Sequence, residues 1–172
     1  MLAVSVSDVQ TQRQVDVARW ERFARRLLEH EGIRSNAELG IAFVEEAEIA
    51  EMNERYLGRH GPTDVLAFPI DGPDRSASGA DVLSGPPAVL GDVVICAEVA
   101  WRNAPAHAGS FDEEVALLIV HGILHLLGMD HDDDADAAAM ERRERELLRA
   151  CAPDPEPRGE VTGQVGGACG RP

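Results

Sequence analysis

The segment that begins at Ser110 constrains the fold most strongly, because it contains a helix start, a long apolar helix and a helix stop. Ser110 and Glu113 have the spacing of a capping box, which predicts a helix that begins here and runs to about Leu127. The residues in between are strongly apolar, so other elements must cover most sides of this helix. We therefore expect it to be the central helix of the fold, with Gly128 ending it.

The rest of the chain mixes strand-like and helix-like patterns. Short alternating or apolar runs predict strands at residues 4–6, 39–43, 64–70 and 90–96. Apolar residues at helical spacing predict helices at about residues 16–31, 46–57 and 134–149, with a short helix that runs through Trp101. Such a mixture gives an α/β or α+β architecture, in which helices cover a small sheet.

The length of 172 residues fits one domain, which we assign to residues 1–151. Residues 72–87 are rich in Gly, Pro, Ser and Asp and predict a flexible loop, whereas residues 152–172 predict a disordered tail. No apolar run approaches the roughly 20 residues of a membrane helix. The first residues do not resemble a signal peptide either, so we expect a cytoplasmic protein without membrane contact.

The charge of the chain limits how it can act on nucleic acid. The sequence has 31 acidic and 16 basic residues, which gives a formal net charge of −15. This charge has the wrong sign for a protein that coats nucleic acid through many phosphate contacts. A role with RNA therefore needs a metal ion, a local basic patch or a partner that presents the RNA.

Three histidines near the end of the central helix form the most informative motif. His121 and His125 are one helical turn apart and project from the same face. Gly128 lets the chain turn back, so that His131 can supply a third nitrogen. Three imidazole ligands leave one zinc position for water or substrate, which is typical of a catalytic site. We predict one Zn²⁺ ion here; a structural zinc with a fourth ligand from elsewhere, or core histidines, are the alternatives.

The same histidine spacing occurs in metzincin proteases, where the residue after the first histidine is the glutamate that acts as general base. Gly122 stands at that position and cannot move a proton, which disfavours peptide hydrolysis. A metalloprotease-like hydrolase stays open if another carboxylate approaches the metal. Glu114 is a candidate for supporting His121, because their spacing places both close to one helix face. Asp130 is a candidate for orienting a histidine or capping the turn.

Four segments, in order along the chain, resemble the signatures of a known family. They are Met52-Asn53-x-x-Tyr56, Pro62-Thr-Asp-Val-Leu-x-Phe-Pro69, Leu90-Gly-Asp-Val-Val-Ile95 and His121-Gly-x-Leu-His125-Leu-x-Gly128-x-Asp130-His131. Over about residues 1–150 the chain resembles the YbeY family of bacterial rRNA maturation factors, and Met140 and Glu144 match a Met and a Glu of its last helix. The resemblance implies an α+β fold, in which a small mixed sheet packed with about five helices lies beneath the metal helix.

The resemblance also implies a function. It implies a zinc-dependent endoribonuclease that hydrolyses phosphodiester bonds and selects single-stranded rRNA. His121 and His125 are the implied catalytic residues. It further implies maturation of the 3′ end of 16S rRNA and late quality control of the 30S subunit or 70S ribosome in the cytoplasm. The implied partners are the small ribosomal subunit and a ribosomal protein or assembly GTPase. The alternative is a ribosome-assembly binding factor whose zinc is mainly structural.

The sequence departs from the family pattern at an arginine implicated in RNA cleavage. Many members have Arg directly after the tyrosine of the second helix, whereas this chain has Leu57. Our candidates for stabilising charge on the transition state are Arg59 and, one helical turn before it, Arg55. Ala67 stands where the family commonly has Ser.

Overall fold

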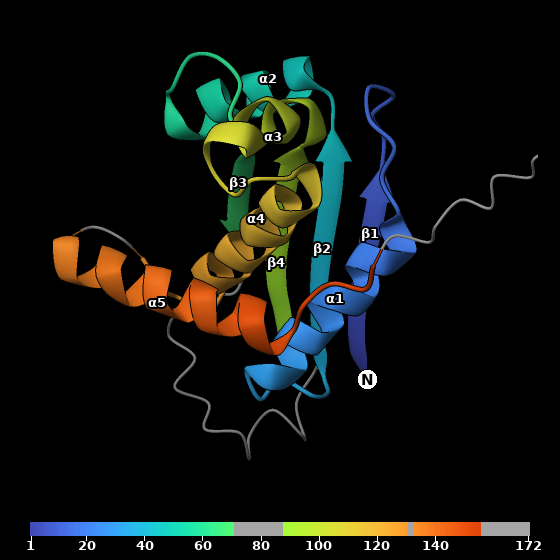
Figure 1. Ribbon diagram of the computed structural model, residues 1–172, viewed down its shortest axis with the longest axis vertical. Helices are drawn as coiled ribbons and strands as arrows, with labels where there is room; N and C mark the ends of the chain where they lie inside the picture. The colour runs from blue at the N-terminus through green and yellow to red at the C-terminus, as the bar shows by residue number, and fades with distance from the viewer. Residues whose placement is uncertain (71–87, 131–132, 156–172) are drawn as a thin grey trace, which may run out of the picture.

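The computed structural model describes residues 1–70, 88–130 and 133–155 (Figure 1). Its elements follow in the order β1 (Leu2–Asp8), α1 (Val17–His30), β2 (Ala37–Val44), α2 (Glu46–Leu57), β3 (Val65–Pro69), β4 (Ala88–Cys96), α3 (Ala97–Asn103), a 3₁₀ turn (Ala104–Ala106), α4 (Phe111–Leu126) and α5 (Asp134–Ala150). The four predicted strands and five predicted helices are all present, with ends that differ by a few residues. The predicted loop at residues 72–87 lies outside the described residues.

The four strands form one sheet in the order β1-β2-β4-β3. β1 pairs with β2 and β2 with β4 in parallel, whereas β3 runs antiparallel to β4. The sheet is therefore mixed, which confirms the predicted α+β class. β3 is an edge strand of this sheet, so only one of its two sides is paired with a described strand.

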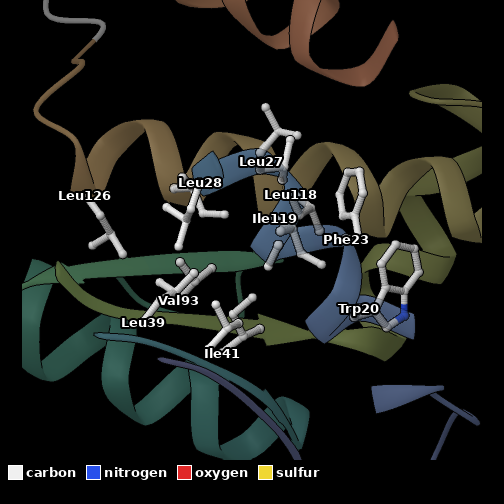
Figure 2. Close-up of a cluster of buried hydrophobic side chains, with 14 of the residues drawn as sticks. Trp20, Phe23, Leu27, Leu28, Leu39, Ile41, Val93, Leu118, Ile119 and Leu126 are labelled. Carbon is white, nitrogen blue, oxygen red and sulfur yellow. The ribbon is translucent and has the colours of Figure 1, made fainter. Parts of the chain in front are cut away.

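Helices cover both faces of the sheet. α4 crosses the sheet diagonally, and α1 lies beside it on the same face (Figure 1). Figure 2 shows Leu39, Ile41 and Val93 pointing from the sheet toward these two helices, while α2 lies on the opposite side. Alternate residues of β4 supply the second, smaller core, in which Val94 packs with Ile49 of α2. The pleat of the strands thus divides the apolar residues between two layers.

The ends of α4 follow the local signals of the sequence. The Ser110 side chain accepts a hydrogen bond from the backbone N–H of Glu113, and the Glu113 carboxylate accepts from the backbone N–H of Ser110. At the other end Gly128 has a φ of 90°, and the N–H of Met129 donates to the carbonyl of Leu124. This bonding pattern satisfies carbonyls of the last turn and stops the helix just beyond the histidine pair.

The first residues of the predicted tail lie against α1. The carboxylate of Asp154 pairs with Arg22 at 2.9 Å and with Arg26 at 3.1 Å, and its backbone carbonyl accepts a hydrogen bond from Arg19. The two arginines hold the pKa of Asp154 below its ordinary value. Residues 156–172 lie outside the described part of the chain. None of the helices within the described ranges has the length and hydrophobicity to span a bilayer.

Candidate functional site

The two histidines of α4 face one another across a helical turn. Their Nε2 atoms are 3.0 Å apart, and the ring centroids are 4.6 Å apart with the ring planes at 79°. Both side chains are half-buried, so they are held by the protein and still reach the surface. The predicted i, i+4 geometry therefore brings two nitrogens to one point.

Glu144 of α5 orients the first histidine. Its Oε1 lies 2.7 Å from the Nδ1 of His121, and the side chain of Glu144 is 13% exposed. A carboxylate at this position favours a proton on Nδ1, which leaves the Nε2 of His121 as the nitrogen with a lone pair. Histidine ligands of metals commonly have this arrangement. The pair of His121 and Glu144 therefore fits a bound cation.

The third predicted ligand cannot be placed. His131 lies outside the described residues, and within the described ranges no three His, Cys, Asp or Glu side chains gather into a metal-binding group. The structure thus brings together His121 and His125 of the predicted set, and the part played by His131 stays a prediction.

Two clefts meet at His121. The first, which we call the α5 cleft, has a volume of about 370 Å³ and lies between α4 and α5. The second, which we call the α2 cleft, has a volume of about 770 Å³ and follows β3 from the end of α2 to the end of α4. His121 and Asp64 line both clefts, whereas His125 and Arg59 line the α2 cleft. The histidine pair is therefore accessible from the groove beside the edge strand.

A short loop places Arg59 in the α2 cleft. Gly58 ends α2 with a φ of 64°, and the backbone N–H of Arg59 donates to the carbonyl of Asn53. The buried Asn53 side chain also donates to the carbonyl of Gly61 at 2.9 Å. These bonds fix the path of the loop. The other candidate, Arg55, lies over the ring of Tyr56, 5.5 Å from its centroid.

Asp64 fixes the start of β3 at the junction of the two clefts. Its Oδ1 accepts hydrogen bonds from the backbone N–H of Val65 at 2.9 Å and from the Thr63 hydroxyl at 3.2 Å. Its Oδ2 lies 3.4 Å from the side-chain amide of Asn103. Through these contacts Asp64 positions the first residues of β3.

Gly122 allows α4 to lie close to the sheet. A Cβ at this position would be 2.5 Å from one methyl of Val93 and 2.9 Å from the other. The position that carries the general base in metzincins therefore has no room for a side chain unless Val93 moves. This close approach of α4 to β4 accounts for a glycine at the position after the first histidine.

A second histidine–glutamate pair contributes its histidine, His107, to the lining of the α5 cleft. Glu114, which is 0% exposed, accepts from the Nδ1 of His107 at 2.9 Å and from the backbone N–H of Ala108 at 3.2 Å. The hydrogen bond and the charge of Glu114 raise the pKa of His107. The prediction that Glu114 supports His121 is corrected here: Glu114 contacts His107, and Glu144 of α5 contacts His121.

Comparison with known proteins identifies the family. The model of the family described as Endoribonuclease YbeY matches residues 5–152. This match covers most of the chain, including α4 and both clefts.

The chain belongs to the YbeY family.

Curated members of the family are similar along most of their length. A protein named Endoribonuclease YbeY from Acidothermus cellulolyticus is 45% identical over 81% of this chain and 86% of its own. The protein of that name from Beutenbergia cavernae is 42% identical over 78% of this chain and 87% of its own, and that of Staphylococcus aureus is 40% identical over 76% and 86%. The solution structure of TM1509 from Thermotoga maritima has the same fold, with a TM-score of 0.54, 24% identity and 87% of each chain covered.

Proposed function

We propose that this YbeY-family protein is a zinc-dependent endoribonuclease that cleaves single-stranded rRNA, with one Zn²⁺ held by His121, His125 and His131. One observation carries the proposal: two Nε2 atoms lie 3.0 Å apart at the junction of two clefts, and Glu144 holds the far nitrogen of one of these rings. Family membership supports endoribonuclease activity, and the donor set supports the metal.

The chain's own groups would divide the work as follows. When bound, zinc supplies a Lewis acid that activates water and polarises a phosphate oxygen. Glu144 keeps the His121 ring in one orientation and one tautomer. Arg59 is the cation that lines the α2 cleft among the described residues, so it is the better placed candidate for the phosphate charge. Arg55 lies over the ring of Tyr56 and is not among the residues that line the α2 cleft, so it is the less well placed candidate.

The charge of the protein suggests where the RNA comes from. A net charge of −15 gives little long-range attraction for RNA, so affinity for a naked strand at physiological salt should be low. We propose that the small ribosomal subunit, with a ribosomal protein or an assembly GTPase, presents the strand in the cytoplasm. The proposed roles are maturation of the 3′ end of 16S rRNA and quality control of the 30S subunit and 70S ribosome.

The test uses the purified full chain and two histidine variants. Native protein should contain about one equivalent of zinc, and it should cut a single-stranded RNA but not the matching duplex. His121→Ala and His125→Ala should lose both zinc and cleavage while keeping the wild-type circular dichroism spectrum. His60→Ala is the matched control, because its side chain is 85% exposed and pairs with Glu54. Equal cleavage by the folded His121 and His125 variants would refute the metal nuclease.

The same variants separate the alternative function. If the zinc is mainly structural in an assembly factor, His121→Ala should unfold the domain and abolish binding to the small subunit. If the nuclease proposal is right, His121→Ala should still bind the subunit, and cells that carry only this variant should accumulate 16S rRNA with an unprocessed 3′ end. Cleavage of an unstructured protein by the wild type, blocked by a chelator, would instead favour the protease-like alternative.

A further inference from the structure

The α2 cleft contains an aromatic side chain that burial does not explain. Tyr56 follows Ile49 and Met52 on the apolar face of α2, but it is 59% exposed, whereas Ile49 is 0% exposed. Exposing a large ring gains nothing for the stability of the fold. Single exposed apolar residues are common on protein surfaces. The surroundings of this ring therefore decide whether it can bind a ligand.

Neighbouring side chains hold the Tyr56 ring in place. Phe68 of β3 packs edge to face against it, with ring centroids 5.2 Å apart and an interplanar angle of 69°. Arg55 lies 5.5 Å from the centroid of the Tyr56 ring. Tyr56 and Phe68 line the same cleft as His121 and His125. Because Tyr56 is 59% exposed, a ring held by these two contacts can present its remaining surface to a ligand at little cost in conformational entropy.

We propose that Tyr56 is a stacking platform for one unpaired nucleobase of the RNA strand in the α2 cleft. This inference rests on the proposed endoribonuclease function and names how the same site recognises its substrate. Aromatic side chains stack on bases of any sequence, because every base has a π-face. A base inside a duplex is already paired and stacked, so this contact selects single strands over duplexes.

The charges of the cleft support stacking as a main source of affinity. Its charged lining includes Arg59, but also the carboxylates of Asp64 and Asp130. Phosphate contacts alone therefore give the strand little net attraction in this groove. Stacking needs no positive protein charge, so it is compatible with an acidic protein. Affinity that depends on stacking also falls less steeply with salt than affinity that depends on many phosphate contacts.

The test compares variants of Tyr56 with a matched aromatic residue outside the cleft. Tyr56→Leu removes the ring, whereas Tyr56→Phe keeps it and removes only the hydroxyl. Trp101→Leu is the control, because Trp101 is 47% exposed and has Arg13 over its ring at 3.7 Å, yet it does not line the α2 cleft. Each variant is assayed on an end-labelled single-stranded RNA for KM and kcat, and by anisotropy for binding.

Tyr56→Leu should raise KM and weaken binding by about 5-fold to 150-fold, with a smaller effect on kcat. Tyr56→Phe and Trp101→Leu should stay close to the wild type. A series of RNAs with one abasic nucleotide moved along the strand locates the stacked base. The wild type should lose affinity at one position of the series, and Tyr56→Leu should not lose more there, because the missing base and the missing ring remove the same contact.

The outcomes separate this inference from the proposed function. If the wild type cuts single-stranded RNA and Tyr56→Leu has an unchanged KM, the stacking proposal is wrong and the nuclease stands. If the wild type binds the strand without cutting it, and Tyr56→Leu alone loses binding, stacking is right and the nuclease is wrong. Equal sensitivity of both proteins to every abasic position, or an equal loss in Trp101→Leu, would also overturn the stacking proposal.

Discussion

Two histidine–glutamate pairs each contribute a histidine to the lining of the α5 cleft, and they use α4 in opposite ways. In one pair α4 supplies the carboxylate of Glu114, which is 0% exposed, to a His107 side chain that is 60% exposed. In the other, α4 supplies the imidazole of His121, which is 29% exposed, to the carboxylate of Glu144 on α5. The Nδ1 to carboxylate distances are similar, at 2.9 and 2.7 Å.

The surroundings of each histidine decide what its pair can do. The Nε2 of His121 lies 3.0 Å from the Nε2 of His125, so this pair orients a nitrogen that has a second nitrogen beside it. His107 has a buried carboxylate for a partner, which raises its pKa and favours the imidazolium. A similar hydrogen bond therefore belongs in one pair to a candidate metal ligand and in the other to a ring whose pKa is raised beside a buried carboxylate.

The largest effect should come from removing a ring of the pair on His121. His121→Ala should lower RNA cleavage by more than about a hundredfold. Removing a residue that supports a metal ligand typically costs up to about a hundredfold in activity, and removing the ligand itself should cost more. His107→Ala, at the other pair, should leave zinc content near that of the wild type. Zinc content and cleavage rate measured on both variants check the comparison. Equal loss of zinc in the two would show that the pairs do not differ in this way.

Removing only the carboxylate of this pair should have an intermediate effect. Glu144→Ala should weaken zinc binding by about 10-fold to 100-fold, because His121 loses the group that fixes its tautomer and orientation. Competition with a chromogenic chelator measures the affinity. Glu141→Ala is the control, since Glu141 lines the same cleft but its side chain is 67% exposed and pairs with Arg145.

A change of packing beneath the histidines should affect stability. Gly122→Ala should destabilise the fold by about 1–3 kcal/mol, because its Cβ would press on the methyls of Val93. Urea denaturation measures the change. Val93→Ala removes these methyls, so the double variant should be less destabilised than the sum of the two single variants. Additive effects would show that the close approach of α4 to β4 has another origin.

The smallest effect should come from neutralising the buried carboxylate of the other pair. Glu114→Gln should lower the pKa of His107, which NMR titration of the ring can follow. A raised folded pKa stabilises the fold below the unfolded value of about 6.5, and this contribution is lost as the pH rises through the folded pKa. The part of the stability difference that depends on pH should be about 1 kcal/mol or less, because solvent screens the exposed ring.

The direction of this pH effect is the sharper test. The difference in unfolding free energy between the wild type and Glu114→Gln should shift in favour of the wild type as the pH falls from 8 to about 6. The same titration on Glu144→Gln provides a comparison at the other pair. A difference that grows in favour of the wild type toward high pH would mean that His107 is not the group responsible.

Much of the site could be predicted because its signals are local. Ser110 and Glu113 form the predicted capping box, and Gly128 ends α4 with a positive φ. The one-turn spacing of His121 and His125 was enough to bring their nitrogens together. Each of these features depends on groups within a few residues along the chain, where the backbone geometry is set by the helix itself.

The partners of these residues could not be predicted in the same way. Helical spacing placed Glu114 near the face of His121, but it could not show that His107 would supply the hydrogen bond. Ile49 and Tyr56 likewise share one face of α2 by their spacing, although only Ile49 of the two is buried. Spacing fixes which residues share a face of a helix, whereas the elements that cover the face decide burial and partners.

The sequence by itself determined the mixed strands and helices, the start and end of α4, and a pair of histidines able to reach one point. The tertiary structure decided that Glu144 orients His121, that Gly122 lies against Val93, and that Tyr56 is exposed beside the histidines. The reason is physical: capping and helical spacing act over a few residues of one chain segment. The tautomer of a histidine and the exposure of a ring depend on elements that are distant in sequence and meet only in the folded protein.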